Sequence, residues 1–179
     1  MAVVDPARYS VIEALRDGRR MEIRALTPDD RTALLAAVDR TSTESLYRRF
    51  FSARRRFTER ETAYLLNVDF KNHVALVAVV YEGGRQTIIA GGRYIMVEPG
   101  KAELAFAVVD DYQGQGVGST LLRHLATIAR AGHVQEFTAE VLAENTPMLR
   151  VFERSGLRVR TKTESGVIYV EAHLDPSPS

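Results

Sequence analysis

Cysteine is absent from this chain of 179 residues. Its absence excludes disulfide bonds, thiolate metal sites and a cysteine nucleophile. A charge excess is also lacking, because 24 basic and 23 acidic side chains leave a formal net charge of +1. No global field therefore favours a nucleic acid or a membrane as partner. The four histidines are scattered without the spacing of metal ligands, so we expect no metal site.

Long apolar runs are missing as well. No run approaches the ~20 residues of a membrane span, and the N-terminus, which contains Asp5 and Arg8, lacks the apolar core of a signal peptide. We therefore expect a cytoplasmic protein. An apolar fraction of 45% and a charged fraction of 26% are ordinary for a globular domain. The length suits a single domain with a substantial core.

Turn signals and apolar periodicity predict one α/β domain with a mixed sheet and an opening β-hairpin. The domain should cover residues 11–174, after an N-terminal extension at 1–10 and before a disordered tail at 175–179. Strands are expected at 11–15, 21–26, 73–81, 87–97, 102–109, 137–142, 157–162 and 167–173. Helices are expected at 31–38, 43–51, 58–66 and 117–131, with a shorter one after Asn145.

The helix expected at 117–131 has an amphipathic pattern. Its apolar stripe consists of Leu121, Leu122, Leu125, Ile128 and Ala129. The opposite, polar side should carry Arg123, His124, Thr127 and Arg130.

A glycine-rich segment separates the strand expected at 102–109 from this helix. Its sequence is Gln113-Gly114-Gln115-Gly116-Val117-Gly118-Ser119. Three glycines in five residues let the backbone approach a ligand closely, since no Cβ interferes. The helix N-terminus presents unpaired N–H groups and the positive end of a dipole. Together these features predict a site for a phosphate or diphosphate group.

Two other phosphate-binding motifs do not fit this segment. A Walker A loop needs a lysine, and none occurs between Lys101 and Lys162. A dinucleotide fingerprint needs a further glycine at a position that holds Ser119 or Leu121. A plain strand-to-helix turn without a ligand is the remaining alternative.

A second informative segment covers residues 144–157. Asn145 suits the N-cap of a short helix, and Pro147 suits its first turn, where a missing N–H costs nothing. Gly156 suits a left-handed C-cap. One face of this helix would carry Met148, Val151, Phe152 and Ser155.

The two segments together resemble the signatures of the GCN5-related N-acetyltransferase (GNAT) superfamily. The first matches Gln-x-x-Gly-x-Gly at a helix start, and the second resembles Asn-x-x-Met/Ala-x-x-x-Tyr/Phe-x-x-x-Gly-Phe/Leu at the expected distance. The resemblance implies the GNAT fold, a mostly antiparallel mixed sheet flanked by helices. Segments 45–52, 68–70 and 73–78 are similar to the acetyltransferase domain of bacterial Pat-type protein lysine acetyltransferases. This similarity covers residues 11–160.

The resemblance implies acetyl-CoA as co-substrate. Its diphosphate would be held by backbone N–H groups at Gly114, Gln115, Gly116, Val117, Gly118 and Ser119, and Gln113 would brace the turn. The pantetheine arm would add like a strand, with main-chain contacts from Phe106, Ala107 and Val108. Asn145 either reaches the cofactor arm or serves only as the N-cap.

Glu103 is the expected general base. It is the one carboxylate inside the apolar strand that leads into the glycine-rich segment, and it matches the position of the catalytic glutamate in Pat-type enzymes. An ammonium group cannot attack a thioester, so a base must first remove a proton. Partial burial would make this carboxylate a stronger base. The alternative is a structural Glu103 paired with Arg93 on the neighbouring strand.

Phe152 is a departure from the family pattern, although we expect it at the cofactor. Many relatives carry tyrosine there as the acid that protonates the leaving thiolate, and phenylalanine cannot donate a proton. Either water supplies that proton or the thiolate leaves unassisted, because a thiol has a pKa of about 8.5.

The segment before the central strands contains a basic cluster and three aromatic residues. The cluster suits a solvated helix face, or a contact with an acidic protein or with the 3′-phosphate of the cofactor; it consists of Arg48, Arg49, Arg54, Arg55, Arg56 and Arg60. The three aromatic residues, Tyr47, Phe50 and Phe51, would either pack in the core or help to shape the acceptor site.

Three functions remain open. The first is acetyl transfer to protein lysine side chains, and the second is acetyl transfer to a small-molecule amine. An open surface around Glu103 would favour the first, and a closed pocket the second. The third is an acyl-CoA-binding module without catalysis, which a Glu103 sealed in a salt bridge would favour.

Overall fold

The computed structural model describes residues 4–42, 44, 45 and 57–175. Most of the helix expected at 43–51 lies outside these residues. So do the aromatic side chains and most of the basic cluster, namely Tyr47, Phe50, Phe51, Arg48, Arg49, Arg54, Arg55 and Arg56. Arg60 is described and exposed.

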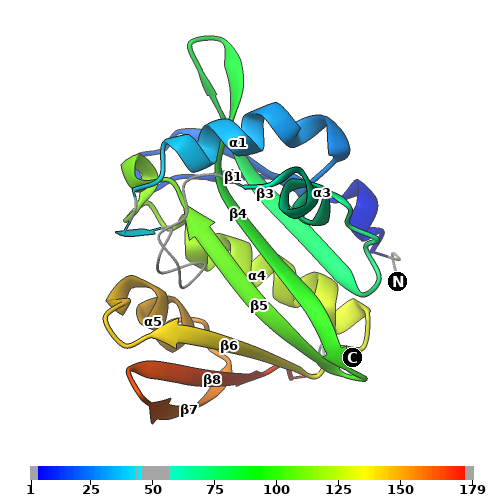
Figure 1. The fold of residues 1–179 in the computed structure, drawn as a ribbon, viewed down its shortest axis with the longest axis vertical. Helices are drawn as coiled ribbons and strands as arrows, with labels where there is room; N and C mark the ends of the chain where they lie inside the picture. Colours follow the sequence, from blue (N-terminus) through cyan, green and yellow to red (C-terminus); the bar gives the residue numbers. More distant parts are fainter. Residues whose placement is uncertain (1–3, 43, 46–56, 176–179) are drawn as a thin grey trace.

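The described residues form a sheet with helices on both faces (Figure 1). Its strands are β1 (Ser10–Ala14), β2 (Arg20–Ala25), β3 (His73–Glu82), β4 (Arg85–Glu98), β5 (Lys101–Val108), β6 (Glu136–Leu142), β7 (Arg158–Glu164) and β8 (Val167–His173). The helices are α1 (Arg31–Asp39), α3 (Glu59–Leu66), α4 (Val117–Ala131) and α5 (Thr146–Glu153). Short 3-10 turns occupy Pro6–Arg8, Pro28–Asp30 and Asp110–Tyr112.

The sheet has eight strands in the order β1-β2-β3-β4-β5-β6-β8-β7. Every neighbouring pair is antiparallel except β5 and β6, which run parallel. The β1–β2 hairpin turns through Gly18, whose φ of +88° is a conformation that glycine adopts without strain. The expected fold class is therefore confirmed, including the opening hairpin and the mostly antiparallel sheet.

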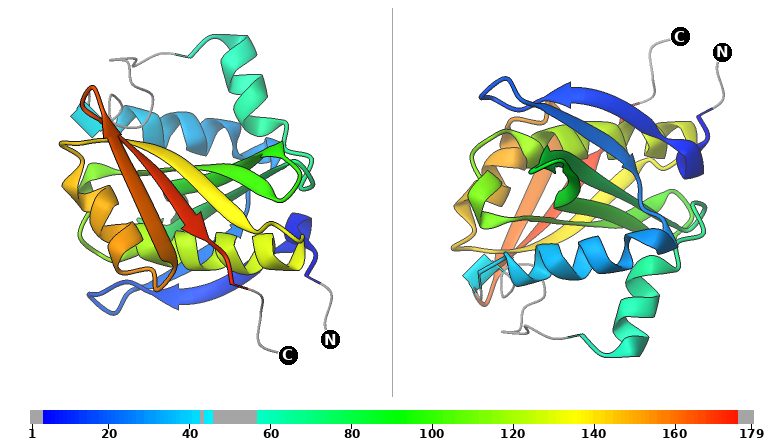
Figure 2. Two further views of the ribbon diagram at one scale, coloured as in Figure 1. Left: turned by 90° about the horizontal axis from the view of Figure 1, so that it is seen from below. Right: turned by 90° about the horizontal axis from the view of Figure 1, so that it is seen from above.

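Helices cover both faces of the central strands. Figure 2 shows α1 and α4 on opposite sides of the sheet. Leu121 and Leu125 of α4 are fully buried in one core, and Leu66 of α3 belongs to a second core on the other face. Because both faces of β3 are covered, residues 73–80 are all buried, which explains their continuous apolar run.

Helix α4 has the predicted bounds and the predicted apolar stripe. The expectation that His124 lies on its solvent side is wrong, because this side chain is buried. The N-terminal residues fold over that side of α4, so that Nδ1 of His124 contacts the hydroxyl of Tyr9 and Nε2 lies 2.7 Å from Oε1 of Glu13. The His124 contact, with help from Arg123, lowers the pKa of the Glu13 carboxyl.

Both ends of the described chain are attached to the domain. Val4 and Tyr9 pack against the main core, and β1 already begins at Ser10, one residue before the expected boundary. At the other end, the carbonyl oxygen of Asp175 accepts a hydrogen bond from Arg130. The rest of the tail expected to be disordered, residues 176–179, lies outside the described residues.

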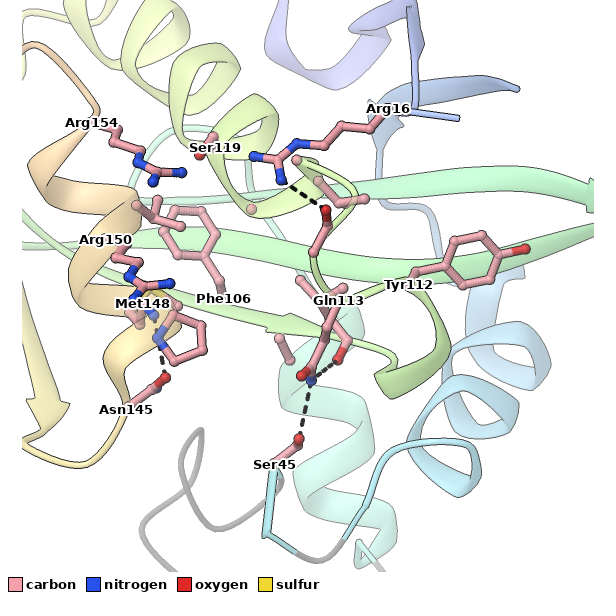
Figure 3. A pocket seen from close by; sticks show the side chains of 18 residues that line it. Arg16, Ser45, Phe106, Tyr112, Gln113, Ser119, Asn145, Met148, Arg150 and Arg154 are labelled. Carbon is pink, nitrogen blue, oxygen red and sulfur yellow. Dashed lines mark hydrogen bonds between the residues drawn. The ribbon is translucent and has the colours of Figure 1, made fainter. Parts of the chain in front are cut away.

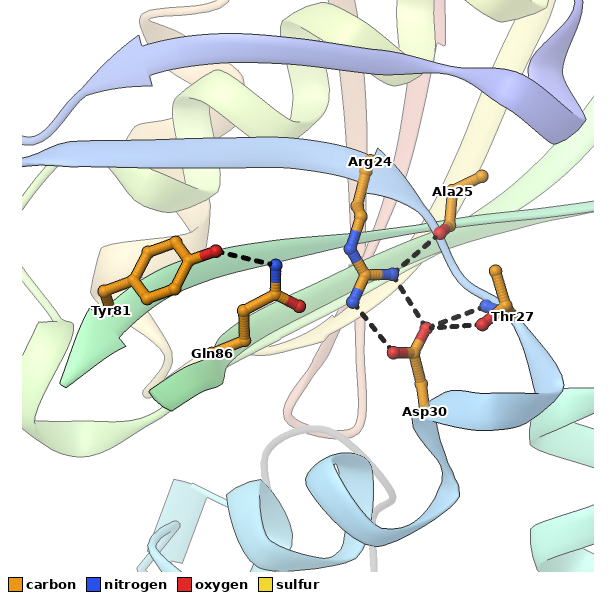
Figure 4. A network of polar contacts seen from close by, with 6 residues as sticks. All are labelled: Arg24, Ala25, Thr27, Asp30, Tyr81 and Gln86. Atoms are coloured by element: carbon orange, nitrogen blue, oxygen red, sulfur yellow. Dashed lines mark hydrogen bonds and ion pairs between the residues drawn. The ribbon is translucent and has the colours of Figure 1, made fainter. Parts of the chain in front are cut away.

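A partly buried ion pair fixes the start of α1 against β2 (Figure 4). Arg24 donates two hydrogen bonds of 2.8 Å to the carboxylate of Asp30, which also accepts from the N–H of Thr27 at 2.8 Å. Burial alone would raise the pKa of Asp30, but the hydrogen bonds from Arg24 and Thr27 outweigh it and lower this pKa. The ion pair therefore holds the start of α1 next to β2.

The parallel strands β5 and β6 diverge. Their pairing covers only three positions and ends where Glu103 lies opposite Thr138. β5 continues to pair with β4 as far as Val108, so its other edge is open over the last residues. Figure 1 shows the gap between β5 and β6 widening toward the end that leads into α4. An open strand edge offers unpaired main-chain groups to a ligand.

Candidate active site

A cavity of about 310 Å³ lies where the open end of β5 meets the starts of α4 and α5 (Figure 3). The part of the wall predicted as a cofactor site consists of Phe106, Ala107, Val108, Gln113, Gly114, Gly116, Val117, Gly118, Ser119 and Asn145. Sequence reasoning did not assign the rest, which are Arg16, Ser45, Tyr112, Pro147, Met148, Arg150, Val151 and Arg154. The fold thus gathers ten predicted residues in one place.

The glycine loop, residues 113–116, uses the conformations that only glycine adopts freely. Gly114 and Gly116 have φ values of +82° and +84°, and Gly116 is the N-cap of α4. The first bond that ties the helix to the loop runs from the N–H of Thr120 to the carbonyl oxygen of Gly116 at 3.1 Å. The N–H groups of the preceding helical turn have no partner within the helix. They border the cavity and can donate hydrogen bonds to an anion.

The β1–β2 hairpin braces this loop from outside. Nη1 of Arg16 donates to the carbonyl oxygen of Gly114 at 3.0 Å, and the Arg16 N–H donates to the carbonyl oxygen of Gln115 at 3.3 Å. The side chain of Gln115 accepts a hydrogen bond from the N–H of Asp17 at 3.2 Å. Gln115 is thus turned toward the hairpin, and its side chain is not part of the cavity wall.

The side chain of Gln113 connects the loop with β5 and with Ser45. Its Nε2 donates to the carbonyl oxygen of Val108 and to the hydroxyl of Ser45, both at 3.1 Å. Ser45 in turn contacts Asp110, whose carboxylate also accepts the N–H of Ser42 at 2.9 Å. The carboxylate of Asp110 is therefore directed toward Ser42 and Ser45, and Asp110 is not among the described residues that line the cavity.

Tyr112 is buried, lines the cavity and has two guanidinium groups close to its ring. Arg19 lies 5.2 Å and Arg40 lies 6.0 Å from the centre of its ring, and Arg19 also donates to its hydroxyl. Such cation–π contacts hold the ring in place. The hairpin and the end of α1 are thereby attached to the turn that precedes the glycine loop.

Helix α5 closes the cavity on the side of β6. Oδ1 of Asn145 accepts the N–H of Met148 at 3.3 Å, so Asn145 is the N-cap that was predicted, and it also borders the cavity. Gly156 has the expected left-handed conformation, with φ of +78°. Phe152 is buried in the main core and borders a second, smaller cavity of about 40 Å³ between β5 and β6.

Glu103 stands at the point where β5 and β6 part. The expected partial burial is wrong, because Glu103 is exposed. Alternate residues of a strand point to opposite faces, and the positions that face the α4 core belong to Ala102 and Leu104. Within the described residues, no hydrogen bond or ion pair involves the Glu103 carboxylate. The alternative partner, Arg93, lies opposite Ala105 and donates to the carbonyl oxygen of Leu65.

A third cavity of about 80 Å³ lies on the face of the sheet that carries Glu103. It is mostly apolar and is walled by α1, α3 and the small side chains of β4 and β5. Ala107 borders both this space and the large cavity, so the two are separated by a single strand. The wall includes Leu34, Leu65, Gly91, Arg93, Ala105 and Ala107.

His73 lies beside this region and is neutral in the folded protein. Burial, with help from the charge of Arg93, lowers its pKa to about 4. Nη1 of Arg93 lies 2.9 Å from Nε2 of His73. Because a guanidinium only donates hydrogen bonds, this ring nitrogen must be the acceptor. The side chain therefore carries no proton at Nε2.

Within the described residues, no helix is both long and apolar enough to cross a bilayer. The same residues contain no group of three side chains suited to hold a metal ion. The polar groups at the site include main-chain N–H groups, three arginines and the exposed carboxylate of Glu103.

Comparisons with known proteins agree with this geometry. Residues 40–157 match the sequence model of the Acetyltransferase (GNAT) family. The chain is 36% identical over 164 residues to Acetyltransferase Pat of Mycolicibacterium smegmatis, covering 90% of this chain and 48% of that protein. It is 31% identical over 138 residues to Acetyltransferase PA5475 of Pseudomonas aeruginosa, covering 76% and 74% of the two chains.

A solved structure gives the same result. The crystal structure of the GNAT domain of S. lividans PAT superposes with a TM-score of 0.83 at 35% identity, covering 92% of this chain and 97% of that one. The chain spans about half the length of the mycobacterial relative. The chain therefore belongs to the GNAT acetyltransferase family, and within that family it is similar to the Pat acetyltransferases.

Proposed function

We propose that the chain transfers an acetyl group from acetyl-CoA to a primary amine, with protein lysine side chains as acceptors and Glu103 as general base. One observation carries the proposal. The cavity at the glycine loop and the exposed carboxylate of Glu103 lie at opposite ends of the open edge of β5. An elongated thioester with a diphosphate at one end fits that arrangement.

The N–H groups at the start of α4 would bind the diphosphate. The main chain of Phe106, Ala107 and Val108 would pair with the pantetheine arm, because β6 has left that edge free. With a strand rise of about 3.3 Å, Phe106 and Glu103 are about 10 Å apart along β5. The thioester end of the substrate would then approach Glu103.

Glu103 would take a proton from the incoming ammonium group, either directly or through one water molecule. The amine nitrogen then forms a bond to the thioester carbon, the bond from that carbon to sulfur breaks, and the second proton of the nitrogen passes to water to leave a neutral amide. Phe152 has no proton to give the leaving thiolate, so water would supply one, or the thiolate would leave as such.

The exposure of Glu103 supports a protein acceptor. A lysine on a protein surface can reach a carboxylate that is open to solvent, and no ion pair among the described residues seals Glu103. The same observation speaks against a binding module without catalysis. A small-molecule amine is the alternative acceptor, and the third cavity, of about 80 Å³ beside Ala105 and Ala107, is the feature that favours it.

Labelled acetyl-CoA, incubated with the protein and a cell lysate, tests the acceptor. Label on protein lysines supports the proposal, whereas label only on small amines favours the alternative. The Glu103→Gln variant tests the base: we expect kcat to fall about 10²- to 10⁴-fold while the affinity for acetyl-CoA persists. Glu164→Gln, an exposed strand glutamate of β7, is the matched control. Near-normal turnover of Glu103→Gln would exclude this role.

A further inference from the structure

The wall of the large cavity carries more positive charge than a diphosphate requires. It contains Arg16, Arg150 and Arg154, and no acidic residue is among the described residues that line it. The diphosphate already has the N-terminus of α4 as its partner in the proposed function. Coenzyme A carries a third phosphate, on the 3′ position of its ribose, which the N-terminus of α4 does not hold in this arrangement.

Arg16 has a structural partner, whereas the other two arginines have none. Arg16 donates to the carbonyl oxygen of Gly114. Arg150 and Arg154 are exposed, and within the described residues neither guanidinium makes a hydrogen bond or an ion pair. Arg150 lies in the last turn of α5 and Arg154 caps its C-terminus, so that the two like charges are four residues apart and repel each other. A doubly charged anion placed between the two guanidinium groups would attract both and offset their mutual repulsion.

The position of α5 is fixed next to the helix that would hold the diphosphate. A Cβ built on Gly118 would lie 3.4 Å from Cγ2 of Val151, so the first turn of α4 and the middle of α5 are in close contact. Figure 3 shows Arg154 and Arg16 reaching toward Ser119 from opposite sides, while Arg150 extends beside Met148 and Phe106 on the same side as Arg154. The guanidinium groups of Arg150 and Arg154 thus border the proposed diphosphate site on one side.

We propose that Arg150 and Arg154 bind the 3′-phosphate of coenzyme A and make the site selective for the 3′-phosphorylated nucleotide. This inference rests on the proposed function. Guanidinium groups suit it because they are always charged and bind phosphate oxygens with two parallel hydrogen bonds. Arg16 has a different role, since it holds the loop that receives the diphosphate.

The test compares the dissociation constants of coenzyme A and of 3′-dephospho-coenzyme A by calorimetry. We expect the intact protein to bind coenzyme A about 10- to 100-fold more tightly. Arg150→Gln and Arg154→Gln should each reduce that ratio, and the double variant should bring it close to one. In all of these variants the affinity for the dephospho form should remain near that of the intact protein.

Two controls separate this role from general effects of charge and folding. Arg160→Gln removes an exposed arginine of β7 outside the cavity and should leave the ratio unchanged. Arg16→Gln should weaken both nucleotides to a similar extent. Equal affinity of the intact protein for the two nucleotides would overturn this inference but not the proposed function. The same would follow if Arg150→Gln and Arg154→Gln weakened the affinity for both nucleotides equally. Failure to bind either nucleotide would overturn the proposed function and this inference with it.

Discussion

Gln113 and Val108 are joined across the turn between β5 and α4, since Nε2 of Gln113 donates to the carbonyl oxygen of Val108 at 3.1 Å. The same nitrogen donates to the hydroxyl of Ser45. One side chain therefore connects the glycine loop with the open end of β5 and with the segment after α1. These are the elements that a coenzyme A molecule in the cavity would touch.

Replacing Gln113 by alanine should loosen the loop. The loss of two hydrogen bonds, each of about 1 kcal/mol, predicts an affinity for acetyl-CoA about 5- to 30-fold lower. Gln86→Ala removes a comparable bond, from Nε2 to the hydroxyl of Tyr81, at the start of β4 and outside the cavity wall (Figure 4), and should leave binding unchanged. Calorimetry on both variants checks this prediction. Unchanged binding by Gln113→Ala would contradict it.

Gly116→Ala should impair both stability and binding. The Cβ itself meets no atom closer than 3.6 Å, so the strain comes from a φ of +84°. We expect the free energy of unfolding to fall by about 1–2 kcal/mol, and acetyl-CoA to bind at least about tenfold more weakly because the helix N-cap moves.

Gly166→Ala is the matched control for this strain. Gly166 has a φ of +79° and open space around its Cβ position, in the turn between β7 and β8. Its unfolding free energy should fall by a similar amount, while acetyl-CoA binding stays normal. A binding loss of the same size in both variants would show that the effect at Gly116 is not local.

Gly92→Ala should destabilise the core beneath the site. An added Cβ would lie 2.7 Å from Cδ1 of Phe106 and 3.1 Å from Cδ1 of Leu125. Overpacking of this kind costs about 1–3 kcal/mol, and the displaced Phe106 ring would also disturb the cavity wall. Gly91→Ala, whose nearest atom is the Leu76 carbonyl oxygen at 3.8 Å, should be close to neutral. Denaturant unfolding of both variants measures the difference; equal stability would contradict the prediction.

His73 should make stability depend on pH. Its pKa is about 4 in the folded protein, against 6.5 as its ordinary value. Between these two values the unfolded chain binds more protons, so the free energy of unfolding falls as the pH drops from 6.5 to 4. We expect a loss of about 1–3 kcal/mol across this window.

The variant His73→Gln isolates this contribution. Its unfolding free energy should fall less than that of the intact protein between pH 6.5 and pH 4. The neighbouring carboxylate of Asp69 affects a different pH range. The backbone N–H groups of Lys71, His73 and Asn72 lower its pKa from the usual value of 3.8, so its contribution to the free energy of unfolding is lost only as the pH falls below 3.8. Identical pH curves for the variant and the intact protein would contradict the prediction.

The sequence by itself determined the local features of the fold. Helix α4 has the predicted bounds, Asn145 caps α5, and the glycines at 114, 116 and 156 have positive φ. These features depend on a residue and its near neighbours along the chain, which is why residue type and spacing predict them. The order of strands and helices follows from the same local patterns.

Only the tertiary structure decided what meets at the site. Arg16 lies 98 positions before Gly114 in the chain, and their hydrogen bond exists because the β1–β2 hairpin folds against the glycine loop. Glu103 was predicted to be partly buried and is exposed, and His124 was predicted to face solvent and is buried. Periodicity shows which side of an element a residue occupies, but burial depends on which distant segment covers that side. For Glu103 no described segment does, and for His124 the N-terminal residues do.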